Sequence, residues 1–249
     1  MDIFTFAPLA ALLQFVYSLV SGLATLVTPF AGSAAAALAI VALTVIVRTL
    51  LIPVSVSQVK AEWHRRRIAP KLKALQDKYK KKPQLLQEKT MALYKAENVS
   101  PFAGFLPTLL QAPVVSLVYA LFLHPTIAGQ ANTLLTAQLG PVTLGSSIFA
   151  AGWPGILVWA ALLAIMAVVA WLTRRTAQRL ALPGTDATAT LTRVLGWLPF
   201  LSVVFAAFVP LAAALYLATT TAWTLAERAL LRRRYWGEAG VAGVPAGAA

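Results

Sequence analysis

The sequence contains no cysteine, which excludes disulfide scaffolds, thiolate metal sites and cysteine nucleophiles. Only eight of its 249 residues are acidic and only two are histidines, so groups that could converge in a catalytic site are scarce. The P-loop, dinucleotide-binding, HExxH and GxSxG patterns are missing too, so neither nucleotide use nor hydrolysis has motif support. We therefore expect no enzymatic activity, no catalytic residue, no metal ligand and no cofactor.

Charge of either sign is scarce as well, and hydrophobic residues take its place. Charged residues make up 12% of the chain, against about a quarter in soluble domains. Hydrophobic residues make up 59%, and the mean hydropathy is +0.75. Several apolar runs reach the roughly 20 residues that a helix needs to cross a bilayer. The composition predicts an all-α polytopic membrane protein.

The positive charge is concentrated in three clusters. Residues 60–95 hold twelve Lys and Arg, a second cluster lies in residues 174–193, and a third in residues 228–234. Long stretches without Lys or Arg separate them, which is the positive-inside pattern of cytoplasmic loops. We expect a multi-pass protein of the bacterial plasma membrane with its N-terminus outside and its C-terminus in the cytoplasm. This placement also argues against DNA as a partner, despite the net charge of +13.

The hydrophobic pattern predicts a five-helix transmembrane core. The predicted segments are an N-terminal interfacial amphipathic helix (1–32), a first span (33–58), a cytoplasmic basic antiparallel helical hairpin (59–99), a second span (100–123), an external loop (124–152), a third span (153–173), a cytoplasmic loop (174–193), a fourth span (194–209), a fifth span (210–231) and a cytoplasmic tail (232–249). Pro210 divides an apolar stretch that is too long for one crossing. The tail from Gly237 is rich in Gly, Ala and Pro, which predicts disorder.

The N-terminal segment has two interpretations. Residues 4–30 are apolar enough to span the membrane as a sixth helix. However, Gln14, Ser18, Ser21, Thr25 and Thr28 are spaced 4, 3, 4 and 3 residues apart, which places them on one helical face. A polar face of this kind favours a helix that lies in the outer membrane interface.

The polar segment between the first two spans carries most of the basic residues. Ile68, Leu72, Leu75 and Tyr79 form an apolar helical stripe, and Pro83 is suited to open a second helix. A short link between two amphipathic helices predicts the hairpin. Its basic face would contact anionic lipid or an acidic partner such as ribosomal RNA. The residues expected there are Arg65, Arg66, Arg67, Lys71, Lys73, Lys78, Lys80, Lys81 and Lys82.

Arg48 is the one charged residue inside the predicted first span. It lies about nine residues from the cytoplasmic end, too deep for its side chain to reach the interface. A charge at mid-span costs about 2.5–3.5 kcal/mol. Two arrangements would reduce this cost: an ion pair with Glu227, or a water-filled cavity inside the helical bundle.

Other polar residues of the predicted spans could line such a cavity. The candidates are Thr44, Gln111, Tyr216 and Thr220, with Thr221 as a further one. A hydrogen bond from each threonine to its own helix is an alternative with similar weight.

A resemblance to the YidC/Oxa family of membrane protein insertases is carried by the run VIVRTLLIPVSVSQVKAEWHRRRIAPKLKALQDKYKKKPQLLQEKTMALYKAENVSPFAGFLPTLLQAPVVSLVYALF. It contains an Arg in the first span followed by a Pro, a P-K-x-x-x-L-Q-x-K-Y-K pattern, and Leu-Pro-x-x-x-Gln-x-Pro at the second span. The later run GWLPFLSVVFAAFVPLAAALYLATTTAW resembles the last two family spans more weakly. Ser100, Phe105, Leu217 and Glu227 depart from residues that are frequent in the family.

The resemblance implies a groove that is open to the cytoplasm and lipid and closed to the outside. Arg48, Thr44, Gln111, Tyr216 and Thr220 would line it. Nascent membrane proteins would be the clients, inserted without nucleotide hydrolysis, and the Sec translocon, the translating ribosome and anionic lipids would be further partners. Two other functions stay open: a small-anion transporter or channel with Arg48 as its binding site, and a scaffold that assembles membrane complexes without inserting them.

Overall fold

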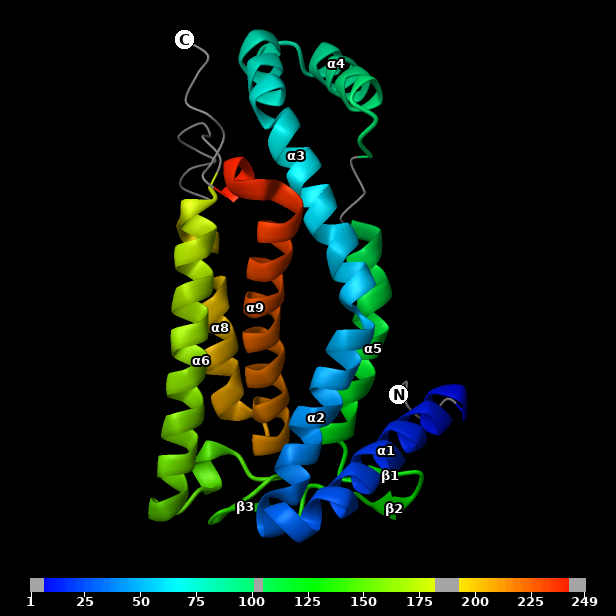
Figure 1. Cartoon of the computed structure of the whole chain (residues 1–249), viewed down its shortest axis with the longest axis vertical. Helices are drawn as coiled ribbons and strands as arrows, with labels where there is room; N and C mark the ends of the chain where they lie inside the picture. The colour runs from blue at the N-terminus through cyan, green and yellow to red at the C-terminus, as the bar shows by residue number, and fades with distance from the viewer. Residues whose placement is uncertain (1–6, 101–104, 182–192, 242–249) are drawn as a thin grey trace. The chain divides into compact units, whose positions relative to one another are not determined.

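The structure is a computed structural model that describes residues 7–100, 105–181 and 193–241. The side chains of residues 7, 105–108, 110–114 and 237–241 are outside this description. The described residues are mostly helical, which confirms the predicted all-α fold class (Figure 1). They divide into two compact units. The first unit comprises Met1–Leu50, Ala112–Arg174 and Trp197–Leu225, and the second comprises Leu51–Gln111, Arg175–Gly196 and Ala226–Ala249.

The first unit begins with two helices that pack against each other. Helix α1 (Ala7–Ala31) runs obliquely to α2 (Ala35–Leu50), and the short 3-10 helix η2 (Gly32–Ala34) joins them (Figure 1). Gly32 has a φ of +52°, a conformation that glycine adopts without strain and that lets the chain turn. Leu13, Val16 and Val20 are buried in the core that α2 shares.

Two antiparallel β-hairpins form much of the segment 124–152. The first pairs β1 (Thr126–Ile127) with β2 (Gln130–Ala131), and the second pairs β3 (Gln138–Leu139) with β4 (Val142–Thr143). The 3-10 helix η3 (Ile148–Ala150) follows.

The segment 124–152 is tied to the first turn of α9 (Leu211–Val241). The backbone N–H groups of Leu211 and Ala212 donate to the carbonyl oxygens of Ser146 and Leu144 at 2.9 and 2.8 Å. Since the first N–H groups of a helix have no partner inside it, these bonds satisfy donors that would otherwise be left unpaired.

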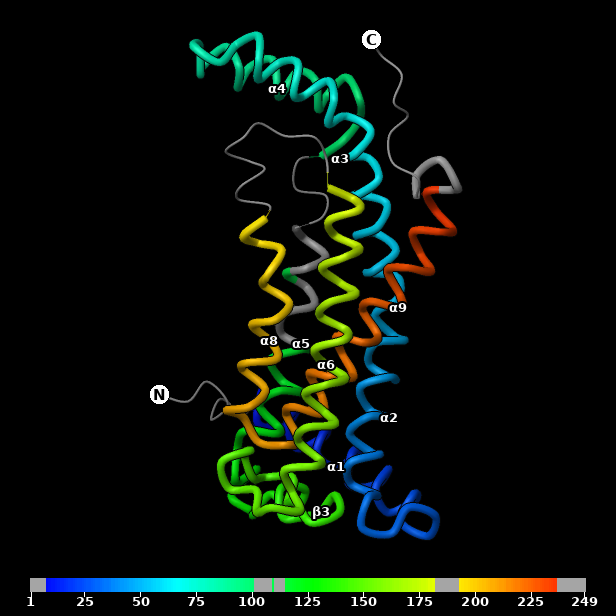
Figure 2. The backbone as a smooth tube through the Cα atoms, turned by 90° about the vertical axis from the view of Figure 1, so that its left-hand side faces the viewer, coloured from blue at the N-terminus to red at the C-terminus, as the bar shows by residue number. Residues whose placement is uncertain are grey.

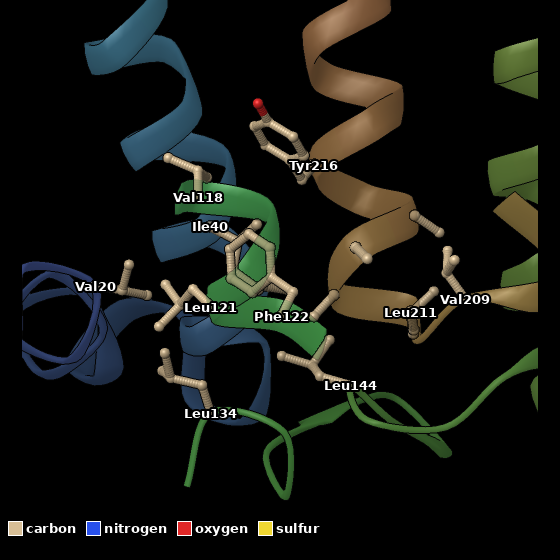
Figure 3. Close-up of a cluster of buried hydrophobic side chains, with 14 of the residues drawn as sticks. Val20, Ile40, Val118, Leu121, Phe122, Leu134, Leu144, Val209, Leu211 and Tyr216 are labelled. Carbon is tan, nitrogen blue, oxygen red and sulfur yellow. The ribbon is translucent and has the colours of Figure 1, made fainter. Parts of the chain in front are cut away.

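Side chains from several elements meet in the apolar core of the first unit (Figure 3). α1, α2, the end of α5 (Phe105–Leu123), the segment 124–152, α8 (Leu198–Phe208) and α9 all contribute. Phe122 and Leu121 are fully buried between Ile40 of α2 and Leu211 of α9.

Two helical stretches of the described chain are long and apolar enough to cross a membrane. They are Pro8–Leu50 and α6 (Trp153–Arg179), and Arg193–Phe208 forms a shorter apolar helix. Figure 2 shows α6 and α8 running side by side. Only 28% of the most apolar window of α6 is buried within the protein, and Leu157, Ile165 and Val168 are exposed. An apolar surface this extensive is typical of a helix that faces lipid.

In the second unit, α3 (Ile52–Tyr79) packs against α4 (Pro83–Ala96), which folds back beside it (Figure 1). Pro83 occupies the first turn of α4, where its missing N–H group costs nothing. Val59, Ala61 and Ile68 of α3 are buried. The indole Nε1 of Trp236, near the end of α9, donates to the carbonyl oxygen of Val59 at 3.2 Å.

The helix ends differ from the predicted segments at several places; for example, α6 continues to Arg179, past the predicted end of the third span at residue 173. The predicted first span (33–58) is divided between α2 and α3, because α2 ends at Leu50 and α3 begins at Ile52. The expectation of disorder from Gly237 is wrong up to Val241, where the backbone is still helical. Arg232 and Trp236 anchor the preceding turns in buried contacts, and this packing overrides the low helix propensity of the glycines. The membrane boundaries stay predictions, since helix ends do not mark them.

Candidate functional site

Arg48 lies in the last turn of α2, two residues before the helix ends at Leu50. A cation near a helix C-terminus interacts favourably with the exposed carbonyl groups, by roughly 0.3–1 kcal/mol. This is smaller than the cost of about 2.5–3.5 kcal/mol for a charge at mid-span. At mid-span, where the sequence analysis places Arg48, the end of α2 would offset only part of this cost, and other polar groups would have to contribute the rest.

Tyr216 of α9 is the predicted site residue that the structure brings near Arg48. Its side chain is only 3% exposed, and its ring packs against Phe122 with 6.1 Å between centroids. The hydroxyl is within electrostatic range of Arg48 and close to the side chain of Thr220. In Figure 3 this hydroxyl points away from the apolar side chains below it. Arg48, Tyr216 and Thr220 thus form a polar cluster inside the first unit.

The threonines of the candidate site fall into two classes. The Oγ1 atom of Thr44 donates to the carbonyl oxygen of Ile40 at 2.7 Å, and Thr221 donates in the same way to Leu217 at 2.8 Å. These hydroxyl protons are used within their own helices. Thr220 differs, since its buried Oγ1 has no partner with full hydrogen-bond geometry in the described part of the chain. Of these three threonines, Thr220 is the one whose hydroxyl is available to another group.

Gln111 falls within α5, but its side chain lies outside the described residues. Its predicted place in the groove stays a prediction, as does that of Thr44, which is almost completely buried at 1% exposure.

A polar stripe on α9 extends beyond the residues that the sequence analysis singled out. Tyr216, Thr220, Trp223 and Glu227, which we call the α9 polar stripe, are spaced 4, 3 and 4 residues apart and so share one helical face. The indole Nε1 of Trp223 and the Oε1 atom of Glu227 are buried without a hydrogen-bond partner among the residues with described side chains. The regular spacing of polar groups in an apolar run was the signal for Trp223. Glu227 was considered as a partner of Arg48 and as a departure from a residue frequent in the family.

The basic residues predicted for the hairpin surface differ in their contacts. Arg66 pairs with Glu62 at 3.6 Å, stacks on the ring of Trp236 and donates to the carbonyl oxygen of Leu180. Contacts of this kind hold the second unit together. By contrast, exposed basic side chains cluster at the far end of α3 and in the link to α4. They are Lys78, Lys80, Lys81 and Lys82.

Glu97, just after α4, connects two more of the basic residues to the helix pair. Arg67 Nη2 lies 3.2 Å from its Oε2 atom, and Lys71 donates to Oε1. The hydrogen bond from Lys71, with the positive charges of both partners, lowers the pKa of the Glu97 carboxyl. Arg65 is exposed and Lys73 half-buried on α3. A role of these nine basic residues in partner or lipid contact stays a prediction.

Comparison with known proteins gives one family. The model of the family described as "60Kd inner membrane protein" matches residues 27–238, most of the chain. The chain is similar to "Membrane protein insertase YidC" of Clostridium perfringens, 32% identical over 115 residues, which are 46% of this chain and 48% of the relative. It is also similar to the protein of that name from Oceanobacillus iheyensis, 40% identical over 108 residues (41% and 42%), and from Helicobacter pylori, 44% identical over 81 residues (32% and 15%). The alignments cover about half or less of these curated relatives.

Proposed function

We propose that this chain inserts nascent membrane proteins into the bilayer, because it belongs to the 60Kd inner membrane protein family. This family is also called the YidC/Oxa1 family. The observation that carries the proposal is the polar cluster of Arg48, Tyr216 and Thr220 inside an apolar helical unit. A buried polar atom without a hydrogen bond of full geometry, such as Thr220 Oγ1, costs free energy, so it is retained where water or a ligand supplies the missing bond. The polar tail of a client protein is a ligand of this kind.

Arg48 is the recognition element for acidic tails. Its guanidinium offers five N–H donors and keeps its charge at every physiological pH. Acidic side chains of a client tail would be attracted to it, and the hydroxyl groups of Tyr216 and Thr220 would hydrate the tail partway across the bilayer. The distance over which the tail lacks hydrogen-bond partners becomes shorter, which lowers the barrier to its transfer.

The free energy for insertion comes from the client and the membrane. A client span of about 20 residues gains roughly 6–12 kcal/mol on entering lipid, at about −0.3 to −0.6 kcal/mol per apolar residue. A membrane potential that is negative inside adds about 2.3 kcal/mol per 100 mV for each negative charge moved outward. These terms suffice without nucleotide hydrolysis, so the proposed insertase needs no bound nucleotide.

The proposed topology places the N-terminus outside, the C-terminus in the cytoplasm and the basic clusters on the cytoplasmic face of a bacterial plasma membrane. The exposed residues Lys78, Lys80, Lys81 and Lys82 would then contact anionic lipid headgroups or the translating ribosome. In this orientation α1 lies at the outer interface, with its polar face in the headgroup region. Cooperation with the Sec translocon is part of the same proposal.

Site-specific photocrosslinking tests the proposal. A photoreactive residue replaces Tyr216 or Thr220 while a short membrane protein with an acidic tail is being synthesised. Ile165 and Val168, which are more than half exposed on α6, serve as lipid-facing controls. We expect crosslinks to the nascent chain from the α9 positions, reduced when Arg48→Ala is introduced. Crosslinks no stronger than those of the controls, with function intact in Arg48→Ala, would instead favour the assembly scaffold. Flux of small anions through liposomes containing the protein would favour a channel.

A further inference from the structure

Arg174, near the end of α6, lies against Trp197, the residue that precedes α8, and the two helices run side by side (Figure 2). The centre of its guanidinium is 3.6 Å from the centroid of the indole ring, so the two groups stack. In the described part of the chain no carboxylate pairs with Arg174, and its buried Nε atom has no hydrogen-bond partner. An arginine that stacks on an aromatic ring holds its planar N–H groups in one orientation, and such a group is suited to bind phosphate.

Two tryptophans of α6 indicate the depth of this pair in a bilayer. The side chains of Trp153 and Trp171 are both exposed. They are 18 residues apart in one helix, which corresponds to about 27 Å along its axis. This is close to the roughly 30 Å of hydrocarbon in a bilayer, and tryptophan is enriched at both of its edges. Arg174 follows Trp171 by about one turn, so the spacing favours the level of the lipid headgroups for Arg174.

An apolar groove follows the face of α8 that begins at Trp197. Trp197, Leu201, Val204 and Phe208 are spaced 4, 3 and 4 residues apart and so share one helical face. All four belong to the first unit, as does Arg174. The groove has a volume of about 510 Å³, and the described side chains that line it are Leu198, Leu201, Ser202, Val204, Phe205 and Phe208. Of these, only Ser202 is polar, and its hydroxyl donates within its own helix.

The length of the groove fits one acyl chain. Trp197 and Phe208 are eleven residues apart, which corresponds to about 16 Å along the axis of α8. The hydrocarbon of a single leaflet is about 15 Å thick. Leu201, Val204 and Phe208 are each more than half exposed, so the described part of the chain leaves this face open to the bilayer.

The charge around the groove favours an anionic lipid over a neutral one. α6 carries Arg174, Arg175 and Arg179 in its last two turns and no acidic residue along its length. A positive potential at this end of the helix attracts lipids with a net negative charge. A phosphate held by Arg174 would place the acyl chains of the same lipid beside Trp197, where the groove begins.

We propose that Arg174, Trp197 and the apolar groove of α8 form a binding site for one anionic phospholipid. The phosphate accepts hydrogen bonds from the guanidinium of Arg174, the indole of Trp197 orients that guanidinium, and one acyl chain lies along the groove. The site is separate from the basic residues of the helical hairpin, which attract anionic lipid by charge alone. It requires only that the chain lies in a bilayer, and so does not depend on the proposed insertase function.

Photocrosslinking from the lipid tests this inference. The full-length protein is reconstituted into phosphatidylcholine vesicles that contain a trace of phosphatidylglycerol with a diazirine on its acyl chain. A second set of vesicles contains a trace of phosphatidylcholine with the same diazirine chain. After illumination, mass spectrometry measures the labelling of residues 197–208 relative to residues 153–165 of α6, which include the exposed Leu157 and Ile165.

Two pairs of variants separate the headgroup from the acyl chain. Arg174→Gln removes the charge of the site, and Arg179→Gln is its control, because Arg179 is exposed on the same helix. Val204→Trp fills the groove. Val168→Trp is the matched control, because Val168 on α6 is exposed to the same degree and does not line the groove.

We expect phosphatidylglycerol to label residues 197–208 of the wild type about fivefold more than phosphatidylcholine, which corresponds to about 1 kcal/mol for one arginine at a membrane surface. Arg174→Gln should remove this preference and leave labelling by phosphatidylcholine unchanged, whereas Arg179→Gln should retain most of it. Val204→Trp should lower labelling by both lipids, and Val168→Trp should match the wild type.

Equal labelling by the two lipids in the wild type, or a preference that survives in Arg174→Gln, would overturn the site. Labelling of residues 197–208 no stronger than that of residues 153–165 would also overturn it, and would leave the groove to another occupant, such as the apolar span of a client. A parallel loss on both peptides in Arg174→Gln would indicate a structural role for Arg174 instead. None of these outcomes decides the proposed insertase function, which is tested separately from positions on α9.

Discussion

Arg232 donates hydrogen bonds to the carboxylate of Glu62, which is 170 residues away in the sequence. Its Nη2 atom lies 3.1 Å from both carboxylate oxygens, and its Nε atom lies 3.3 Å from Oε2. The guanidinium of Arg232 also stacks on the ring of Trp236, with 5.3 Å to the ring centroid. A planar guanidinium that meets a carboxylate through two nitrogens is held in one orientation, so this contact fixes the end of α9 against α3.

Glu62→Gln is expected to lower the free energy of unfolding by about 1 kcal/mol. Charge-assisted hydrogen bonds contribute about 1.5–3 kcal/mol, and we reduce this because 31% of the Glu62 side chain is exposed. Denaturant titration of the purified protein in detergent measures the change. Glu88→Gln is the control, because its contact with Lys89 is an exposed pair at 3.5 Å and should contribute almost nothing. Equal effects of the two variants would contradict the assignment.

The sequence predicted the chemical character of Arg232 but not its partner. Arg232 belongs to a basic cluster, and its charge was explained by the positive-inside pattern alone. That pattern constrains which side of the membrane a residue occupies and says nothing of contacts between distant helices. The pairing with Glu62 depends on how α9 continues past the predicted end of its span at residue 231, and buried contacts of Trp236 decide this.

Asn132 should be sensitive to a change that replaces its amide donors. Its buried side chain donates to the carbonyl oxygens of Leu121 and His124 at 2.8 and 3.0 Å and accepts from the N–H group of Leu134 at 3.2 Å. Asn132→Asp replaces two donors with an oxygen that faces two carbonyl oxygens. We expect a loss of about 3 kcal/mol in the free energy of unfolding, since buried hydrogen bonds are broken and a charge is left unpaired.

Thermal unfolding in detergent measures this loss, with Thr136→Ala as the control. Thr136 is in the same segment, but its hydroxyl bond to the carbonyl oxygen of Thr133 is exposed, so its removal should change stability by no more than about 0.5 kcal/mol. An Asn132→Asp variant as stable as Thr136→Ala would show that the Asn132 hydrogen bonds do not hold the segment 124–152 in place.

The packing of α4 on α3 should weaken in acid. The hydrogen bond from Lys71 and the charges of Lys71 and Arg67 lower the pKa of Glu97, so the folded state favours the ionised carboxylate. The stabilisation is therefore complete above the ordinary pKa of a glutamate and is lost as the pH falls through the lowered pKa. Because the chain has no cysteine, spin labels on two introduced cysteines at Ala74 and Ala92 report the distance between the helices. The distance distribution should broaden below about pH 4.

Glu97→Gln supplies the control for this pH dependence. The amide cannot ionise, so the broad distribution should already be present at neutral pH and should not change with acidification. If the variant and the wild type broadened in parallel, another group would be responsible for the acid sensitivity.

Thr44 and Thr220 show how much of the candidate site could be predicted from the sequence. Both were expected in the groove on the same grounds, as threonines in apolar spans with self-bonding as the alternative. The alternatives differ only by a side-chain rotation, which residue identity and spacing do not determine. The structure separates them: Thr44 Oγ1 donates within α2, whereas Thr220 Oγ1 lies close to the Tyr216 hydroxyl and makes no hydrogen bond of full geometry in the described residues. The family and the helical fold class were accessible from the run around Arg48, but this difference was not.

Isosteric substitution at these two positions gives the last prediction. Valine has the shape of threonine without the hydroxyl, so it tests the hydrogen bond and leaves the packing nearly unchanged. Thr44→Val should insert a client with a polar tail at a rate within about twofold of the wild type, because the carbonyl oxygen of Ile40 loses only a second donor. Thr220→Val should slow the same client about fivefold, which corresponds to one hydrogen bond of about 1 kcal/mol made to the tail during transfer. Insertion kinetics in reconstituted liposomes measure both rates, and a client with a fully apolar tail should show no difference between the variants. A larger effect at Thr44 than at Thr220 would mean that the polar tail of the client contacts α2 rather than α9 during transfer.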